Sequence, residues 1–324
     1  MNPSFWQNKR VFVTGHTGFK GSWLCLLLDS LGARLGGYAL EPPTQPNLFS
    51  LAHVDESVES TIGDIRDLDG LSKNLRAFAP DVVFHMAAQS IVLRSYEDPV
   101  DTYSTNVIGT VNMLEAVRRL NRPCVVINVT TDKCYENKGW AWGYREIDAL
   151  GGRDPYSNSK ACSELVGQSY RDSFFPLSRL AEHGVSIAAA RAGNVIGGGD
   201  WTPRQLVPET IAAFLASQSV VLRHPQAVRP WQHVLDCLAG YLDLAQAMEG
   251  DPRTYSGEWN FGPADADSYP VSRVVESLGS RWGIERPWVP DTAVHAPEEL
   301  QLRLDTSKAA KYLVWRCLLP IGET

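Results

Sequence analysis

A glycine-rich turn between two apolar segments constrains the fold more than any other stretch of this chain. Residues 11–13 (Val-Phe-Val) have the composition of a buried parallel strand, and residues 23–28 that of a buried helix. Between them stand three evenly spaced glycines: Gly15, Gly18 and Gly21. Such a turn lets backbone N–H groups and a helix N-terminus bind a pyrophosphate, so we expect a dinucleotide-binding unit. A turn that serves packing alone is the alternative.

The composition limits the classes of protein that come into question. A chain of 324 residues that is 44% hydrophobic can bury a large core, and a net charge of −7 argues against nucleic-acid or membrane partners. No apolar run approaches the ~20 residues of a membrane span. Residues 1–9 lack the apolar stretch of a signal peptide, so we expect a cytoplasmic protein. The 6 cysteines show no metal-ligand spacing, which predicts reduced thiols and no metal site.

Apolar runs and helix-like segments alternate along the first half of the chain. This alternation predicts an α/β fold with a doubly wound parallel Rossmann sheet. After the first strand, we expect strands at 34–40, 58–63, 81–85, 123–130 and 185–190. We expect helices at 68–78, 100–120, from 154 onward, and at 206–216, 234–248 and 271–282. Because the alternation becomes irregular after residue 190, we predict a dinucleotide-binding domain over 1–190 and a smaller, mainly substrate-binding domain over 191–324, with some segments returning to the first.

The ends of the second and third strands bear on the adenosine of the cofactor. A carboxylate after the second strand would bind the ribose of NAD, and the nearest acid, Glu41, lies slightly beyond the usual place. No arginine stands there for the 2′-phosphate of NADP, so we predict NAD. Asp64, after the third strand, is expected to face the adenine, whereas Asp67 suits a helix N-cap better.

Two basic residues inside the glycine turn leave two interpretations open. His16 and Lys20 either supply positive charge to the cofactor phosphates or are solvated loop residues without a role.

Thr131, Asp132 and Lys133 stand just past the end of the strand at 123–130. In open α/β sheets, residues at the carboxyl ends of the strands line the ligand crevice. A hydroxyl, an acid and an amine in succession there can transfer protons, so we predict a catalytic triplet. An ordinary turn is the alternative.

Tyr156 and Lys160 follow an Asp154–Pro155 helix start and lie four residues apart on one helical face. A nearby ammonium, together with a positive nicotinamide ring, would lower the phenol pKa from about 10 so that the phenolate acts as a base. The pair is a strong indication of a catalytic site because it follows the glycine turn and five strand–helix units.

Five motifs, in order, resemble the extended short-chain dehydrogenase/reductase family. They are the glycine turn, the 131–133 triplet, the Tyr156/Lys160 pair, Asn194 with residues 197–201 (Gly-Gly-Gly-Asp-Trp), and residues 229–234 (Arg-Pro-Trp-Gln-His-Val). More narrowly, they are similar to the group of CDP-glucose 4,6-dehydratases. Related dTDP-glucose dehydratases carry Thr-Asp-Glu at the triplet, and 4-epimerases carry a serine-rich triplet without the acid. Lys133 is therefore the residue that discriminates most between substrate classes.

The resemblance implies an internal redox cycle on a nucleotide sugar, here CDP-glucose, with NAD as cofactor. Tyr156 takes the proton of the sugar 4-hydroxyl while hydride passes to NAD+, and Thr131 holds that oxygen. The resulting ketone acidifies the C5 hydrogen, which Lys133 removes while Asp132 protonates the departing 6-hydroxyl. Hydride returns to C6, giving the 4-keto-6-deoxy sugar. Lys133 needs a lowered pKa to act as a base.

The motifs and the resemblance together give two further sets of candidate residues. The candidate cofactor-binding residues are Gly15, His16, Gly18, Phe19, Lys20, Asp64, Ile65, Ala87, Ala88, Gln89, Asn106, Tyr156 and Lys160. The candidate substrate-binding residues are Asn194, Arg204, Arg223, Arg229 and His233. Guanidinium groups match diphosphate oxygens, although any single arginine is more often an ordinary surface residue.

Two other functions stay open from the sequence. One is a nucleotide-sugar 4-epimerase or reductase, and the other is a non-catalytic NAD-binding regulator, which would not need the intact Tyr156, Lys160 and Thr131. The resemblance also implies a homodimer or higher homo-oligomer, in which the helices from Val100 and Tyr156 of two subunits form a four-helix bundle.

Overall fold

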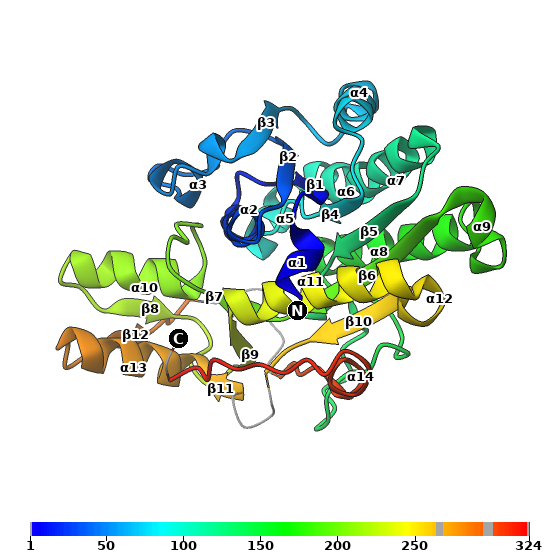
Figure 1. Cartoon of the computed structure of the whole chain (residues 1–324). Helices are drawn as coiled ribbons and strands as arrows, with labels where there is room; N and C mark the ends of the chain where they lie inside the picture. The colour runs from blue at the N-terminus through cyan, green and yellow to red at the C-terminus, as the bar shows by residue number, and fades with distance from the viewer. Residues whose placement is uncertain (1, 264–267, 294–300, 323) are drawn as a thin grey trace.

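Seven parallel strands form the central sheet of the computed structural model, which describes residues 2–263, 268–293, 301–322 and 324 (Figure 1). The strand order is β10-β6-β5-β4-β1-β2-β3, and every neighbouring pair is parallel. The strands are β1 (Arg10–Thr14), β2 (Arg34–Ala39), β3 (Val58–Ile62), β4 (Val82–His85), β5 (Cys124–Val129), β6 (Val185–Ala192) and β10 (Gly257–Phe261). The chain winds from β1 to one edge and later to the other, so a crevice opens at the carboxyl ends of β1 and β4. The predicted doubly wound α/β fold is confirmed.

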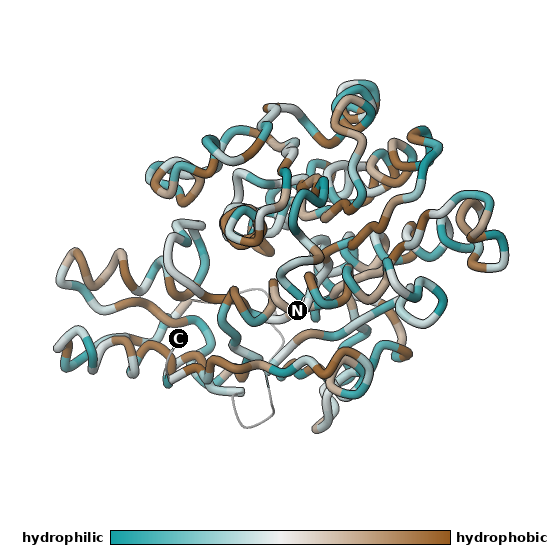
Figure 2. Tube along the Cα trace, in the orientation of Figure 1, coloured by the Kyte–Doolittle hydropathy of each residue, from teal (hydrophilic) through white to brown (hydrophobic). Residues whose placement is uncertain are grey.

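Helices cover both faces of this sheet. They are α1 (Pro3–Trp6), α2 (Phe19–Ser30), α3 (Leu48–Leu51), α4 (Leu68–Phe78), α5 (Val92–Glu97), α6 (Pro99–Tyr103), α7 (Gly109–Leu120), α8 (Pro155–Ser173), α9 (Leu180–His183), α11 (Val234–Gly250), α12 (Pro252–Tyr255) and α14 (Ser307–Tyr312). Alternate residues of β1, β2, β4, β5 and β6 enter two separate cores, one under α2 and α11 and the other under α4 and α7. In Figure 2 hydrophobic residues follow the central strands accordingly. Asp67 caps α4 by accepting a 3.0 Å hydrogen bond from the Gly70 N–H, as predicted.

A smaller lobe is built from short strands and two helices of the second half of the chain. Its elements are β7 (Asn194–Ile196), α10 (Leu206–Leu215), β8 (Val220–Leu222), β9 (Val228–His233), β11 (Ser268–Pro270), α13 (Val271–Trp282) and β12 (Trp288–Pro290). β8 pairs with β12, and α10 and α13 pack on them around a core of their own. In Figure 1 this lobe extends away from the edge of the central sheet.

The segment predicted as one helix at 100–120 is interrupted. A π-helical turn, η2 (Ser104–Ile108), separates α6 from α7. The Thr110 hydroxyl donates a 2.7 Å hydrogen bond to the carbonyl oxygen of Asn106 within this turn. Single π turns inside helices often mark functional sites, and this one lies beside the segment that follows β4.

Within the described residues, no helix has the length and apolar character needed to cross a membrane. The same part of the chain contains no cluster of three or more His, Cys, Asp or Glu side chains able to hold a metal ion.

Candidate active site

The glycine turn after β1 opens onto a cavity of about 770 Å³. Gly15 has a φ of +76°, and a Cβ there would lie 2.8 Å from the backbone nitrogen of Ala87. A Cβ on Gly21 would lie 2.1 Å from the Gly15 carbonyl oxygen, so neither position accepts a side chain. Gly18 caps α2 and lines the cavity. The first N–H groups of α2 therefore stand at the wall of this cavity, which fits a bound pyrophosphate.

The two basic residues of the turn have different places. His16 is buried, its Nε2 lies 2.7 Å from the Ser60 hydroxyl, and its ring packs edge-on against Phe49. Burial lowers the pKa of His16 to about 4, so the ring is neutral and brings no charge to the turn. Lys20 lines the cavity and donates a 3.1 Å hydrogen bond to the Tyr241 hydroxyl. The structure thus separates two residues that the sequence treats alike.

The ends of β2 and β3 form the side of the cavity where the sequence predicts the adenosine. Glu41, Asp64, Ile65 and Arg66 line it. The Arg66 guanidinium is paired with the Asp64 carboxylate at 2.5 Å and with Asp101 at 2.9 Å. These two carboxylates neutralise the charge of the arginine, so the guanidinium is already paired within the protein.

The segment after β4 forms the next part of the wall. Ala87, Ala88 and Gln89 line the cavity. Asn106 is buried behind them, where its amide donates to the Gln89 carbonyl at 3.0 Å and to the Ser159 hydroxyl at 2.8 Å, and accepts from the Gln89 N–H at 2.8 Å. Asn106 therefore fixes the backbone of this wall and links it to α8.

The predicted triplet and the tyrosine–lysine pair meet at one place in the cavity. Thr131, Asp132, Lys133, Tyr156 and Lys160 all line it. Thr131 begins the short helix η3 (Asp132–Cys134), and its hydroxyl donates to the Asp132 carboxylate at 3.0 Å. The Thr131 side chain lies next to the Tyr156 phenol. The four-residue spacing on α8 and the end of β5 thus bring both motifs to one point.

Burial acts in opposite directions on the tyrosine and the lysine. It raises the pKa of the Tyr156 phenol, and the neighbouring Thr131 side chain opposes this rise. It lowers the pKa of Lys160 to about 8, and the positive charge of Lys20 adds to this effect. The protein alone therefore does not lower the phenol pKa as expected from the sequence, and that part of the expectation rests on the positive nicotinamide ring.

Asp132 has the environment of a proton donor. Burial raises the pKa of its carboxyl, against the charges of Lys133 and Arg229. Among the described residues its Oδ2 has no hydrogen-bond partner. A Cβ on Gly193 would lie 3.0 Å from this oxygen, so the glycine leaves room beside it. A buried carboxyl with a raised pKa holds its proton more readily, as general-acid catalysis requires.

Four of the five candidate substrate-binding residues line the cavity: Asn194, Arg204, Arg223 and Arg229. Arg204 is paired with Glu97 at 2.7 Å, and Arg229 is buried and donates to the Val228 carbonyl at 3.0 Å. His233 instead caps α11, since its Nδ1 accepts a 3.1 Å hydrogen bond from the Leu235 N–H.

The comparison with known proteins places these features in a family. A family model described as GDP-mannose 4,6 dehydratase matches residues 12–317. This chain belongs to that dehydratase family. Its members and neighbours within the extended short-chain dehydrogenase/reductases share the parallel sheet described above.

Curated relatives and solved structures of the dehydratase family extend over most of the chain. A CDP-glucose 4,6-dehydratase of Salmonella typhimurium is 49% identical over 324 residues, which are 100% of this chain and 90% of that protein. A dTDP-glucose 4,6-dehydratase of Xanthomonas campestris is 30% identical over 76% of this chain and 70% of its own length. The structure of the dTDP-glucose 4,6-dehydratase DesIV from Streptomyces venezuelae, with NAD bound, matches with a TM-score of 0.78 and 26% identity over 95% of this chain and 92% of that one.

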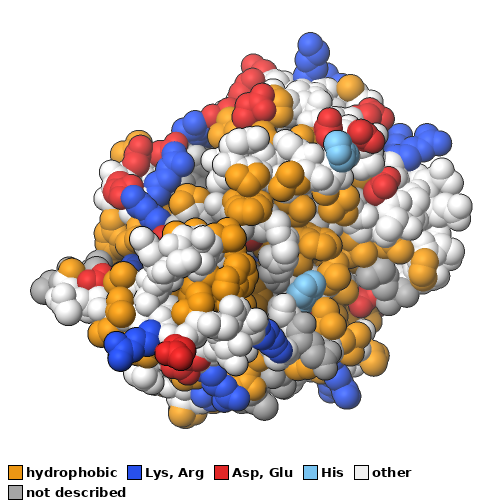
Figure 3. Space-filling model, turned by 90° about the vertical axis from the view of Figure 1, so that its left-hand side faces the viewer, with side chains coloured by type: hydrophobic (Ala, Val, Ile, Leu, Met, Phe, Trp, Pro, Cys, Tyr) orange, Lys and Arg blue, Asp and Glu red, His pale blue; other side chains and the backbone are white. Residues whose placement is uncertain are grey.

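Two sets of residues at or behind the cavity wall were not identified from the sequence as candidate site residues. Apolar side chains complete the cavity wall: Met86, Val129, Leu206, Val207, Leu222 and Trp231. Figure 3 likewise shows hydrophobic side chains gathered around a hollow on one face of the molecule. Behind the wall, Glu164 and Arg191 form a buried ion pair. An arginine at the end of an alanine-rich strand was the available signal for that pair.

Proposed function

We propose that this chain is an NAD-dependent hydro-lyase that converts CDP-D-glucose into CDP-4-keto-6-deoxy-D-glucose and water. The observation that carries the proposal is the buried Asp132 carboxyl, which accepts a hydrogen bond from Thr131 and lines one cavity with Lys133 and Tyr156. Elimination of water needs an acid and a base in addition to the tyrosine of the oxidation step, whereas a 4-epimerase or a ketoreductase uses the tyrosine without them. The choice of nucleotide is supported by the 49% identity with the Salmonella CDP-glucose enzyme.

NAD is the cofactor that suits this chain. The glycine turn would hold its pyrophosphate, Asp64 and Ile65 its adenosine, and Ala87 to Gln89 the inner wall beside Lys160. Glu41 lines the adenosine side and Arg66 is already paired with carboxylates, which favours an unphosphorylated ribose. When bound, NAD+ would take the hydride from C4 of the sugar and later return it to C6.

Each residue of the cluster has its own role in the proposed reaction. Tyr156 takes the proton of the sugar 4-hydroxyl, and Thr131 holds that oxygen. The 4-ketone then acidifies the C5–H bond, whose proton passes to Lys133. Asp132 gives its proton to the 6-hydroxyl, which leaves as water while the C5–C6 double bond forms. Lys160 stands behind Tyr156 and supports the phenolate form by its charge.

We place the domain division near residue 191, with 1–190 as the NAD-binding domain and 191–324 as mainly substrate-binding. The separate core of the smaller lobe supports this division. α11 and β10 belong to the second part by sequence, yet they pack in the central sheet and its core. The substrate groups Asn194, Arg223 and Arg229 would then close the cavity from the smaller lobe.

We further propose a homodimer that pairs α6, η2 and α8 of two subunits. Apolar side chains on these adjoining elements are exposed: Val100 by 77%, Ile108 by 51% and Leu165 by 52%. Light scattering at micromolar concentration should give twice the mass of the chain, and a monomer would contradict the pairing. A cytoplasmic location is part of the same proposal, since none of the 6 cysteines is in a disulfide in the described residues, which include them all.

The mass of the product tests the proposed reaction. The protein and NAD+ are incubated in four parallel reactions with CDP-glucose, dTDP-glucose, UDP-glucose or GDP-mannose. The mass of each product is then measured by mass spectrometry. We expect loss of one water from CDP-glucose in preference to the other three. An unchanged mass with an altered sugar would indicate the 4-epimerase alternative, and no turnover of any substrate would favour a regulator.

A further inference from the structure

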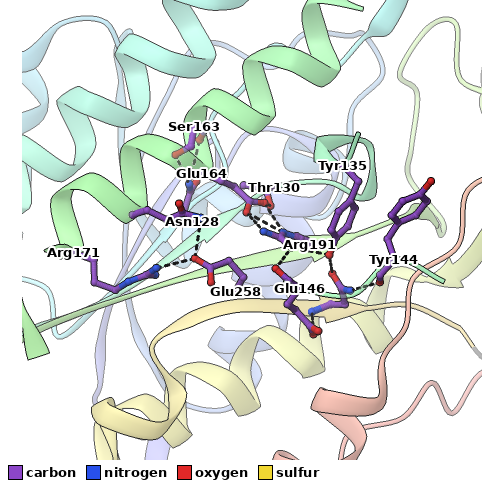
Figure 4. A network of polar contacts seen from close by, with 12 residues as sticks. Asn128, Thr130, Tyr135, Tyr144, Glu146, Ser163, Glu164, Arg171, Arg191 and Glu258 are labelled. Carbon is purple, nitrogen blue, oxygen red and sulfur yellow. Dashed lines mark hydrogen bonds and ion pairs between the residues drawn. The ribbon is translucent and has the colours of Figure 1, made fainter. Parts of the chain in front are cut away.

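A buried ion pair between Arg191 and Glu164 stands at the centre of a network of polar contacts (Figure 4). Arg191 at the end of β6 and Glu164 on α8 have side chains that are 1% and 0% exposed. Arg191 Nε lies 2.9 Å from both carboxylate oxygens of Glu164, and its Nη2 binds the same carboxylate. Such a fork-shaped pair fixes the relative position and orientation of the two elements that carry it.

The pair contacts both ends of the segment that contains the triplet. On the near side, the Thr130 hydroxyl donates a 2.6 Å hydrogen bond to Glu164. On the far side, Tyr135 accepts a 2.7 Å hydrogen bond from Arg191 Nη1, and the guanidinium lies 4.7 Å from the centre of its ring. Burial and the nearby charge of Glu164 raise the pKa of the Cys134 thiol. Residues 131–133 are thus held from both flanks by one ion pair.

The same pair is anchored to the helix of the tyrosine and the lysine. Glu164 stands one helical turn after Lys160 and two turns after Tyr156, on the same face of α8. The ion pair therefore connects α8 to the loop after β5. α8 carries the residues proposed for oxidation, and the loop carries the acid and the base proposed for the elimination.

A second layer of hydrogen bonds holds the ion pair in place. The Tyr135 hydroxyl donates to Asn260 Oδ1 at 2.7 Å, and the Asn260 amide donates to the Tyr144 carbonyl at 2.8 Å. Arg191 also donates to the Glu146 carbonyl at 3.2 Å. A buried charge pair whose remaining donors are satisfied in this way fixes one arrangement, and removal of one partner is costly.

We infer that Glu164 and Arg191, acting through Thr130 and Tyr135, are positioning residues that set Asp132 and Lys133 against the sugar for the elimination step. The inference rests on the proposed function. It makes the rate of elimination depend on the ion pair and leaves the rate of oxidation independent of it. Tyr156 and Lys160 keep their places through α8 itself, which Asp154 caps by a 2.9 Å hydrogen bond from the Ser157 N–H.

Tyr135→Phe tests this inference, with Tyr144→Phe as its matched control. Both tyrosines are buried and their rings are stacked 5.2 Å apart, but the Tyr144 hydroxyl bonds Asn137 and the Lys138 N–H rather than Arg191. In single turnovers with CDP-glucose, Tyr135→Phe should form NADH at the rate of the parent protein and consume it about 10–100-fold more slowly, since a displacement of about 1 Å costs this much. Tyr144→Phe should behave as the parent protein.

Thr130→Val gives a second variant that leaves both charges in place. It removes the hydroxyl that binds Glu164 at nearly constant volume, whereas Thr130→Ser retains the hydroxyl. We expect slow consumption of NADH in Thr130→Val and rescue in Thr130→Ser. Equal slowing of both phases, or unchanged consumption in both Tyr135→Phe and Thr130→Val, would overturn the inference.

A crystal structure of Tyr135→Phe gives a readout that does not need turnover. We expect the Asp132 carboxyl to be displaced relative to Lys160, with Tyr156 unmoved. An unmoved Asp132 would overturn the inference. If the parent protein fails to dehydrate CDP-glucose, the proposed function fails on that result, and the crystal structure still decides the positioning role.

Discussion

Lys160 on α8 donates a 3.0 Å hydrogen bond to the backbone carbonyl oxygen of Val129, the last residue of β5. This bond ties the helix of the oxidation residues to the strand that ends in the triplet. Because the lysine is buried there, its charge is costly, and the pKa of Lys160 falls to about 8.

The lowered pKa of Lys160 predicts a defined pH dependence of stability. Between about pH 8 and its ordinary value of 10.5, the unfolded chain holds a proton on this amine that the folded chain has released. The free energy of unfolding contributed by this group therefore rises with pH through that window. Urea unfolding at pH 7, 8, 9 and 10 should show the parent protein gaining stability relative to Lys160→Met. A difference that is constant with pH would show that the charge of Lys160 is not strained by burial.

Gly193→Ala should disturb the elimination. The new Cβ would lie 2.6 Å from the Pro230 side chain and 3.0 Å from Asp132 Oδ2, so the carboxyl or the loop must move. We expect NADH consumption in a single turnover to slow by about 10–100-fold. Gly198→Ala is the matched control, since nothing lies within 4 Å of a Cβ there. If the two variants have equal rates, the space beside Asp132 has no role in the reaction.

Gly21→Ala should abolish retention of NAD. A Cβ at this position would lie 2.1 Å from the Gly15 carbonyl oxygen. The backbone at Gly15 can move away from the new Cβ only if the turn opens. Gly250→Ala, at the end of α11 with nothing within 4 Å of its Cβ, should keep the affinity of the parent protein. Isothermal titration with NAD+ measures both variants, and unaltered binding by a folded Gly21→Ala would contradict a pyrophosphate site at this turn.

The sequence predicted those parts of the fold and the site that depend on local patterns. The strands from β1 to β6 and the cluster of Asp132 with Tyr156 followed from apolar runs and from the shared edge of parallel strands. The π turn around Asn106 was not predicted, because it depends on tertiary hydrogen bonds to Gln89. The strands β7, β8, β11 and β12 of the smaller lobe were missed, since their 3 residues are too few to show a period.

Buried polar residues were the least accessible from the sequence. His16 has the same polar character as Lys20 in the printed turn, yet only the structure shows it neutral and bonded to Ser60. Arg191 and Glu164 carry charges that a sequence places at the surface by default. Their pairing requires β6 and α8 to be adjacent, which sequence spacing does not show.

The division of labour between Tyr156 and Lys133 is the central claim, and single-turnover absorbance of the nicotinamide tests it most directly. Tyr156→Phe should form no NADH and no product, because elimination depends on the ketone. Lys133→Met should form NADH at the rate of the parent protein and then stall, since loss of a positioned base costs ~10²–10⁴ in rate. Solvent deuterium exchange at C5 should be lost in Lys133→Met. Normal exchange at C5 and normal consumption of NADH in that variant would show that another group removes the C5 proton.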